Sequence, residues 1–91
     1  MRVLVTGAFG NIGSACLGEL LRQGHTVRAF DIRSPRTEET ARDFRGHLEI
    51  LWGDIRDYDA VEDAVRDQEV VIHLAAIIPP ATGRASKMVT G

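Results

Sequence analysis

The sequence is poor in cysteine and has no excess of positive charge, and each shortage excludes a class of protein. Cys16 is the only cysteine among 91 residues, so neither an intramolecular disulfide nor a multi-cysteine metal site can form. Lysine and arginine number 11 against 13 aspartate and glutamate residues, which gives a net charge of −2. Because nucleic acids and anionic membranes attract basic surfaces, we expect neither as a partner.

Long apolar runs are also lacking. No run approaches the length of a transmembrane helix, and the start of the sequence lacks a signal-peptide pattern. We therefore expect a cytoplasmic protein. The apolar fraction of 44% and the charged fraction of 26% are typical of a globular protein, and 91 residues allow one small domain.

The most informative stretch is a glycine-rich loop. An apolar run, Val3 to Val5, leads into Gly7, Gly10 and Gly13, after which a helical pattern begins. Glycine can adopt positive φ and allows a ligand to approach the backbone, and a helix N-terminus offers unpaired N–H donors. The loop therefore predicts a pyrophosphate site. Its spacing is not the common dinucleotide pattern, so a tight turn with close helix packing is the alternative interpretation.

The remaining pattern alternates strands and helices. It predicts four strands and three helices, in chain order a strand at 2–6, a helix at 11–23, a strand at 26–31, a short helix at 37–45, a strand at 48–52, a helix beginning after Asp57, and a strand at 70–74. Pro79 and Pro80 end the last element. We assign residues 1–80 to the domain and 81–91 to a loosely ordered polar tail.

This alternation is typical of the α/β class, with helices on both faces of a parallel sheet. We expect a Rossmann-like sheet of strand order 3-2-1-4, incomplete relative to the full fold, with the ligand at the switch between the first and fourth strands.

Two acidic residues lie at expected strand ends. Asp31 follows Gly13 by eighteen positions, near the spacing of the acid that binds the adenosine ribose. A carboxylate there repels a 2′-phosphate and favours NAD over NADP. Arg33 could accommodate such a phosphate, or it could pair with Asp31 or face solvent.

Asp54 ends the third strand and is followed by Ile55. We interpret Asp54 as an acceptor for the adenine amino group, with Ile55 covering the ring. The alternative is a turn residue beside the helix N-cap Asp57. His73 lies inside an apolar strand, where a hydrogen-bonded core histidine is a better interpretation than a catalytic base. No cluster of ligands predicts a metal site.

Four motifs follow one another in the first 78 residues: Thr6–Gly13, Asp31, Gly53-Asp54-Ile55-Arg56-Asp57 and His73-Leu74-Ala75-Ala76. In order and spacing they resemble the N-terminal half of extended short-chain dehydrogenase/reductases, the NAD-dependent epimerase/dehydratase group. The resemblance implies a Rossmann fold that binds NAD. It also implies roles for individual residues: Gly7, Gly10, Gly13 and the N–H groups of Asn11 and Ile12 at the pyrophosphate, Asp31 at the ribose, Asp54 and Ile55 at the adenine, and Leu74, Ala75 and Ala76 on the nicotinamide side.

The catalytic set of that family is missing. Its members use a Ser or Thr and a Tyr-x-x-x-Lys pair in their second half, whereas the only tyrosine here is Tyr58, with Glu62 four residues later, and the only lysine is Lys87. We expect a fragment, or a naturally short relative, that binds cofactor but is inactive alone. A non-catalytic dinucleotide sensor or interaction module is the alternative. Self-association through an exposed fourth strand is a further expectation.

Overall fold

The computed structural model describes residues 1–74, so the expected domain boundary at residue 80 and the tail at 81–91 lie outside the described residues. The elements in chain order are β1 (Arg2–Thr6), α1 (Asn11–Arg22), β2 (Thr26–Asp31), α2 (Pro35–Ala41), a 3₁₀ turn η1 (Arg42–Phe44), β3 (Glu49–Trp52), α3 (Tyr58–Val65) and β4 (Val70–His73).

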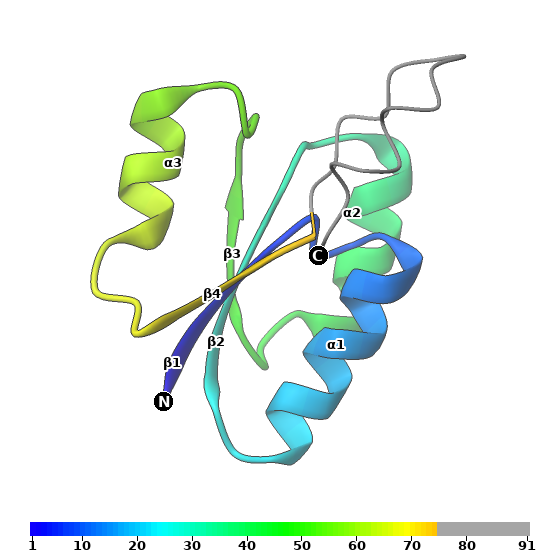
Figure 1. Cartoon of the computed structure of the whole chain (residues 1–91). Coiled ribbons are helices and arrows are strands. Elements are labelled where there is room, and N and C mark those ends of the chain that lie inside the picture. Colours follow the sequence, from blue (N-terminus) through cyan, green and yellow to red (C-terminus); the bar gives the residue numbers. More distant parts are fainter. Residues whose placement is uncertain (75–91) are drawn as a thin grey trace, which may run out of the picture.

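The strands form one parallel sheet in the order β3-β2-β1-β4, which confirms the predicted topology (Figure 1). β1, the first strand in the sequence, lies inside the sheet between β2 and β4. In register, Leu4 pairs with Arg28 on one side and with Val71 on the other. All four strands therefore end at the same edge of the sheet.

Helices cover both faces of the sheet. In Figure 1, α3 lies on one side of the strands, and α1 and α2 lie on the other. Successive residues of β1 point to opposite faces, so Val3 and Val5 pack into the core beneath α1, while Leu4 joins the core beneath α3. Both cores therefore draw on the apolar run of β1, whose residues Val3, Leu4 and Val5 are at most 2% exposed.

The helix expected at 37–45 begins earlier, at Pro35. Ser34 is its N-cap and accepts a hydrogen bond from the Thr37 N–H, while the Thr37 hydroxyl accepts one from the Ser34 N–H. Proline suits the first helical position because its missing N–H would have no partner there. The Ser-Pro pair is therefore a helix start, two residues before the expected one, and this start brings Arg36 and Thr37 close to the end of β2.

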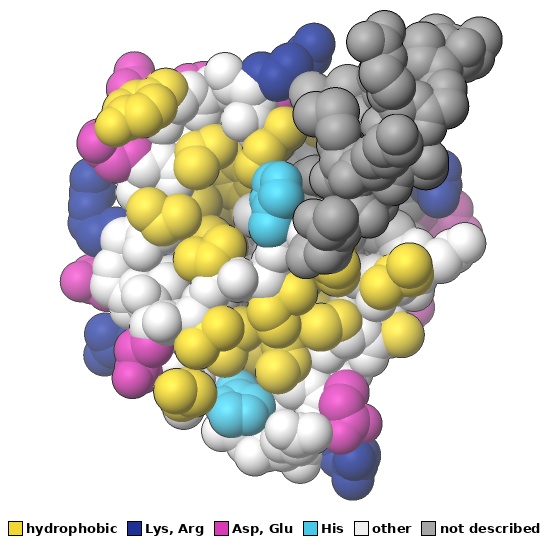
Figure 2. Space-filling view, viewed as in Figure 1, with side chains coloured by type: hydrophobic (Ala, Val, Ile, Leu, Met, Phe, Trp, Pro, Cys, Tyr) yellow, Lys and Arg dark blue, Asp and Glu magenta, His cyan; other side chains and the backbone are white. Residues whose placement is uncertain are grey.

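β4 is an edge strand among the described residues. It runs across the front of Figure 1, and Figure 2 shows hydrophobic side chains gathered across the same front. Val71 is 48% exposed. The expectation of a core histidine is wrong in one respect: His73 is exposed, because the α3 core extends no further than β1, although its Nδ1 lies 2.8 Å from the Thr6 hydroxyl. Self-association through this edge stays a prediction.

The carboxyl end of α3 is held by an arginine from β2. One amino group of Arg28, Nη1, donates to the carbonyl oxygens of Ala64 and Arg66, each at 2.9 Å, and its Nε donates to Glu49 Oε1 at 2.7 Å. The last carbonyls of a helix have no partner within the helix and carry partial negative charge, so a cation there is stabilising. Within residues 1–74, no helix is both long enough and apolar enough to span a bilayer.

Replacing Arg28 by methionine should lower the free energy of unfolding by about 2 kcal/mol, because bonds to two helix-end carbonyls are lost from a charged donor. Urea denaturation of both proteins measures the change. Arg22→Met is the matched control, since Arg22 bonds only to Glu19 on the exposed side of α1 and should cost less than about 0.5 kcal/mol. Equal losses in the two variants would show that Arg28 is not a specific cap.

Candidate functional site

A cleft with a volume of about 570 Å³ opens where the four strands end. Residues from the end of every described strand line it: Gly7 after β1, Asp31 at the end of β2, Gly53 and Asp54 after β3, and Leu74 after β4. In open parallel sheets, this edge is where ligands bind. The remaining residues that line the cleft are Phe9, Gly10, Phe30, Ile32, Ser34, Arg36, Thr37, Ile55 and Arg56.

Two of the three loop glycines are required by the fold itself. Gly7 has φ of 66°, the left-handed region that favours glycine. A Cβ on Gly13 would lie 2.2 Å from the Gly7 carbonyl oxygen and 2.6 Å from that of Ala8, so α1 rests directly on the loop. The alternative interpretation, a tight turn with close helix packing, therefore explains Gly7 and Gly13.

Gly10 is different, because nothing in the described structure requires glycine there. Its φ is −80°, which any residue can adopt, and a Cβ would meet only the Gly7 carbonyl oxygen at 3.7 Å. It lines the cleft as the N-cap of α1, and it has no side chain with which to cap the helix. The glycine therefore keeps the cleft wall free of side-chain atoms next to the first turn of α1, where N–H groups lack intrahelical acceptors.

Asp31 connects the loop to β2. Its Oδ2 accepts a hydrogen bond from the Phe9 N–H at 2.9 Å, and its Oδ1 accepts one from the Ile32 N–H at 2.7 Å. Each carboxylate oxygen can accept a further hydrogen bond, and the residue lines the cleft. The glycine loop and the acid therefore form one unit, with acceptor capacity left for a ligand.

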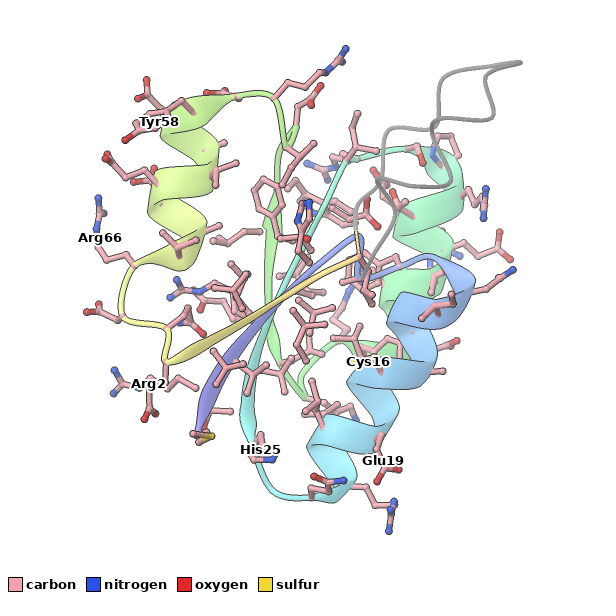
Figure 3. All side chains as sticks on the ribbon, in the orientation of Figure 1. Arg2, Cys16, Glu19, His25, Tyr58 and Arg66 are labelled. Atoms are coloured by element: carbon pink, nitrogen blue, oxygen red, sulfur yellow. The ribbon has the colours of Figure 1, made fainter. Side chains whose placement is uncertain are left out.

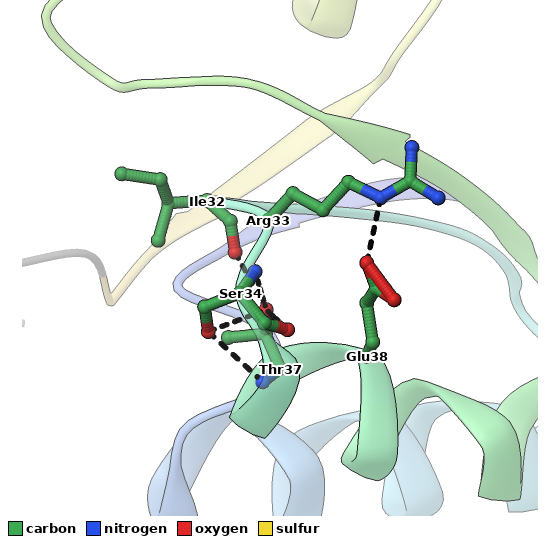
Figure 4. Close-up of polar contacts among 5 residues, drawn as sticks. All are labelled: Ile32, Arg33, Ser34, Thr37 and Glu38. Atoms are coloured by element: carbon green, nitrogen blue, oxygen red, sulfur yellow. Dashed lines mark hydrogen bonds and ion pairs between the residues drawn. The ribbon is translucent and has the colours of Figure 1, made fainter.

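The structure distinguishes between the alternatives left open for Arg33. Its Nε donates to Glu38 Oε1 at 2.8 Å (Figure 4). Its guanidinium carbon lies 5.7 Å from the centre of the Trp52 ring. Arg33 is not among the residues that line the cleft, and its ion-pair partner is Glu38 rather than Asp31. Among the described residues, two arginines line the cleft together with Asp31: Arg36, in the first turn of α2, and Arg56.

Asp54 and Arg56 form an ion pair in the cleft wall. Asp54 Oδ2 accepts from Arg56 Nη2 at 2.7 Å, and Oδ1 accepts from Arg56 Nε at 3.0 Å and from the Arg56 N–H at 2.9 Å. These hydrogen bonds, chiefly from the Arg56 side chain, lower the pKa of Asp54 from 3.8 to about 2. The Asp54 carbonyl also accepts the Asp57 N–H, and Asp57 is the N-cap of α3, as predicted. Asp54 is therefore both a turn residue and part of the cleft wall.

The structure brings together most of the residues that the sequence singled out. Gly7, Gly10, Asp31, Asp54, Ile55 and Leu74 line the cleft. Asn11, Ile12 and Gly13 form the first turn of α1 beside it, with the Ile12 side chain 74% exposed. Arg33 points elsewhere, and Ala75 and Ala76 lie outside the described residues.

Sequence reasoning missed the part of the wall made by α2 and Arg56. A signal was present for α2, because Ser34, Pro35 and Thr37 form a helix start that places Arg36 at the cleft. Tyr58, the only tyrosine, begins α3 on the outside of the molecule and is 77% exposed (Figure 3). In the part of the chain that the structure describes, no group of three histidine, cysteine or acidic side chains could hold a metal ion.

Comparisons with known proteins agree on one family. The model of the NAD dependent epimerase/dehydratase family matches residues 3–87. A 3 beta-hydroxysteroid dehydrogenase/Delta 5-->4-isomerase of Mycobacterium tuberculosis is 43% identical over 77 residues, which are 85% of this chain and 20% of that protein.

Solved structures agree. A short-chain dehydrogenase/reductase superfamily protein from Agrobacterium tumefaciens with bound NAD has a TM-score of 0.70 and 33% identity, over 97% of this chain and 24% of that one. The UDP-glucose 4-epimerase of Thermus thermophilus in complex with NAD has a TM-score of 0.71 and 35% identity, over 85% of this chain and 24% of that one. The chain thus spans about a fifth to a quarter of the relatives it matches.

The loop glycines should differ in their tolerance of a methyl group. Gly13→Ala should lower the free energy of unfolding by about 3 kcal/mol, because its Cβ would meet backbone oxygens that cannot move without shifting α1. Gly10→Ala should change it by less than about 0.5 kcal/mol. Gly18→Ala, in open space on α1, should raise it by roughly 0.5–1 kcal/mol. Thermal or urea unfolding measures all three, and a Gly10 loss as large as that of Gly13 would contradict the open geometry.

The ion pair in the cleft wall should be visible in a titration. In the natural sequence, the Asp54 carboxyl should stay ionised until pH falls to about 2, whereas in Arg56→Gln its pKa should rise towards 3.8. Because the folded-state pKa is lowered, any stability that the pair supplies is present at neutral pH and is lost as pH falls towards that value. The ¹³Cγ chemical shift of Asp54 reports the titration, and identical pKa values in both proteins would exclude the ion pair in solution.

Proposed function

Because this chain belongs to the NAD-dependent epimerase/dehydratase family, we propose that it binds NAD in the cleft where its four strands end. It would do so as the cofactor-binding portion of an oxidoreductase, epimerase or dehydratase. Bound NAD would supply the hydride acceptor of such a reaction. The residues of this chain bind and orient the cofactor.

One observation carries the proposal: Gly10 is a glycine at a cleft position where the protein has room for a side chain. A ligand that needs the backbone at close range explains it. The first-turn N–H groups of α1 lie next to this position and carry the positive end of the helix dipole, which suits a pyrophosphate. The same residues would hold a cofactor without rearrangement of the loop.

The neighbouring acid favours NAD over NADP. Asp31 has acceptor capacity left on both oxygens, so it can bind the ribose hydroxyls, whereas a 2′-phosphate would meet its negative charge. Glu38 holds the guanidinium of Arg33. The preference for NAD therefore depends on the charge of Asp31 against that of Arg36, which also lines the cleft. We propose Asp54 and Ile55 for the adenine and Leu74 for the nicotinamide side.

We further propose that the acid–base chemistry depends on a part of the protein beyond these 91 residues. Tyr58, the only tyrosine, does not line the cleft. A second candidate function, a non-catalytic dinucleotide-binding module, is favoured by a cleft to which the ends of all four described strands contribute. Tight binding of NAD by the 91-residue chain alone would favour the module, whereas detectable but weak binding would favour the fragment.

Isothermal calorimetry of the purified chain tests the proposal. We expect NAD to bind at least about tenfold more tightly than NADP, and Gly10→Ala to weaken NAD binding by about tenfold or more, because its methyl group would occupy pyrophosphate space. Gly18→Ala, on the exposed side of α1, is the matched control and should bind as the natural sequence does. A folded chain that binds no dinucleotide, or a Gly10→Ala variant with unchanged affinity, would contradict the proposal.

A further inference from the structure

Arg56 has no role in the proposed cofactor site, yet it lines the cleft and makes several hydrogen bonds to Asp54. Its guanidinium reaches both oxygens of Asp54, with Nη2 at 2.7 Å from Oδ2 and Nε at 3.0 Å from Oδ1. A separate hydrogen bond from the Arg56 backbone N–H to Oδ1 belongs to the turn and does not involve the side chain. The carboxylate plane is therefore fixed by a planar donor that lies two residues away.

This arrangement determines what Asp54 can offer to a ligand. An ionised carboxylate is an acceptor only, whereas a protonated carboxyl can also donate. Arg56 favours the ionised form by charge and by hydrogen bonding, and it donates to both oxygens, with Nε shared between Oδ1 at 3.0 Å and Oδ2 at 3.2 Å. Three N–H groups of Arg56 thus occupy most of the roughly four acceptor positions of the carboxylate, and the capacity that remains is a capacity to accept.

We propose that Arg56 is a positioning residue that sets the base preference of the cleft, by holding Asp54 as an oriented acceptor for a base with an exocyclic amino group. Adenine carries such a group. Hypoxanthine carries an oxo group at the same position, and its oxygen would face the carboxylate oxygen without a proton between them. This inference rests on the proposed function, since it assumes that a dinucleotide occupies the cleft.

The side chain of Arg56 is well suited to this role. It is 72% exposed, so its removal creates no cavity and leaves no buried group unpaired. The Asp54 side chain is 32% exposed, and without the guanidinium it keeps the backbone hydrogen bond but loses its fixed orientation. A free carboxylate can rotate and bind water in place of the base, so the difference between the two bases should shrink.

The test compares NAD with nicotinamide hypoxanthine dinucleotide, in which an oxo group replaces the exocyclic amino group and the adjacent ring nitrogen carries a proton. Binding of each is measured by calorimetry for the natural sequence, for Arg56→Gln and for Arg66→Gln. Arg66 is the matched control, because it forms a similar exposed ion pair with Asp63 at the end of α3, away from the cleft (Figure 3). Circular dichroism verifies that each variant is folded.

We expect the natural sequence and Arg66→Gln to prefer NAD by about tenfold, the equivalent of one hydrogen bond to a charged group, and Arg56→Gln to prefer it by less than about threefold. Asp54→Asn should also lose the preference, because the asparagine amide can accept from the amino group of adenine or donate to the oxo group of hypoxanthine. An unchanged preference in Arg56→Gln would overturn the inference and leave the proposed function intact. Failure of the natural chain to bind either dinucleotide would overturn the proposed function, and the inference with it.

Discussion

The contact between α1 and the glycine loop is the constraint on which the site depends. Because Gly13 lies against the carbonyl oxygens of Gly7 and Ala8, the axis of α1 is fixed relative to the end of β1. The first-turn N–H groups of the helix are then directed into the region where all four strands end. Asp31 strengthens the same arrangement from β2 by accepting the Phe9 N–H. The pyrophosphate site that we propose thus depends on backbone packing, without a basic side chain in the loop.

Positive and negative potential lie in different parts of the cleft. Backbone dipoles supply positive potential at the loop, whereas the carboxylates of Asp31 and Asp54 lie at the ends of the next two strands. A ligand that carries phosphates at one end and hydroxyl and amino groups at the other matches this division. Of the two described arginines that line the cleft, Arg56 is held by Asp54, and Arg36 lies in the first turn of α2. This division explains how a protein of net charge −2 could offer the phosphate site that we propose.

Much of the fold could be predicted because the sequence shows both the short apolar runs of buried strands and the spaced apolar positions of helices. The strand order, the α1 start and the Asp57 cap followed from apolar runs, glycine positions and capping chemistry. The helix α2 was expected from residue 37 but begins at Pro35, because proline is tolerated at a first helical position, where its missing N–H would have no partner. The exposure of His73 and the ion pairs of Arg33 and Arg56 could not be predicted, because they depend on which helix covers which strand and on side-chain rotamers.

The position of β1 inside the sheet also affects how the chain folds as it is made. β1 pairs with β2 early, but its pairing with β4 joins residues 67 positions apart. At about 5–20 residues per second, synthesis needs between roughly 3 and 13 seconds to cover that distance. During this interval, one edge of the most apolar strand has no partner, and such an edge pairs readily with other chains. The strand that organises the finished sheet is therefore also the one that most needs protection on the ribosome.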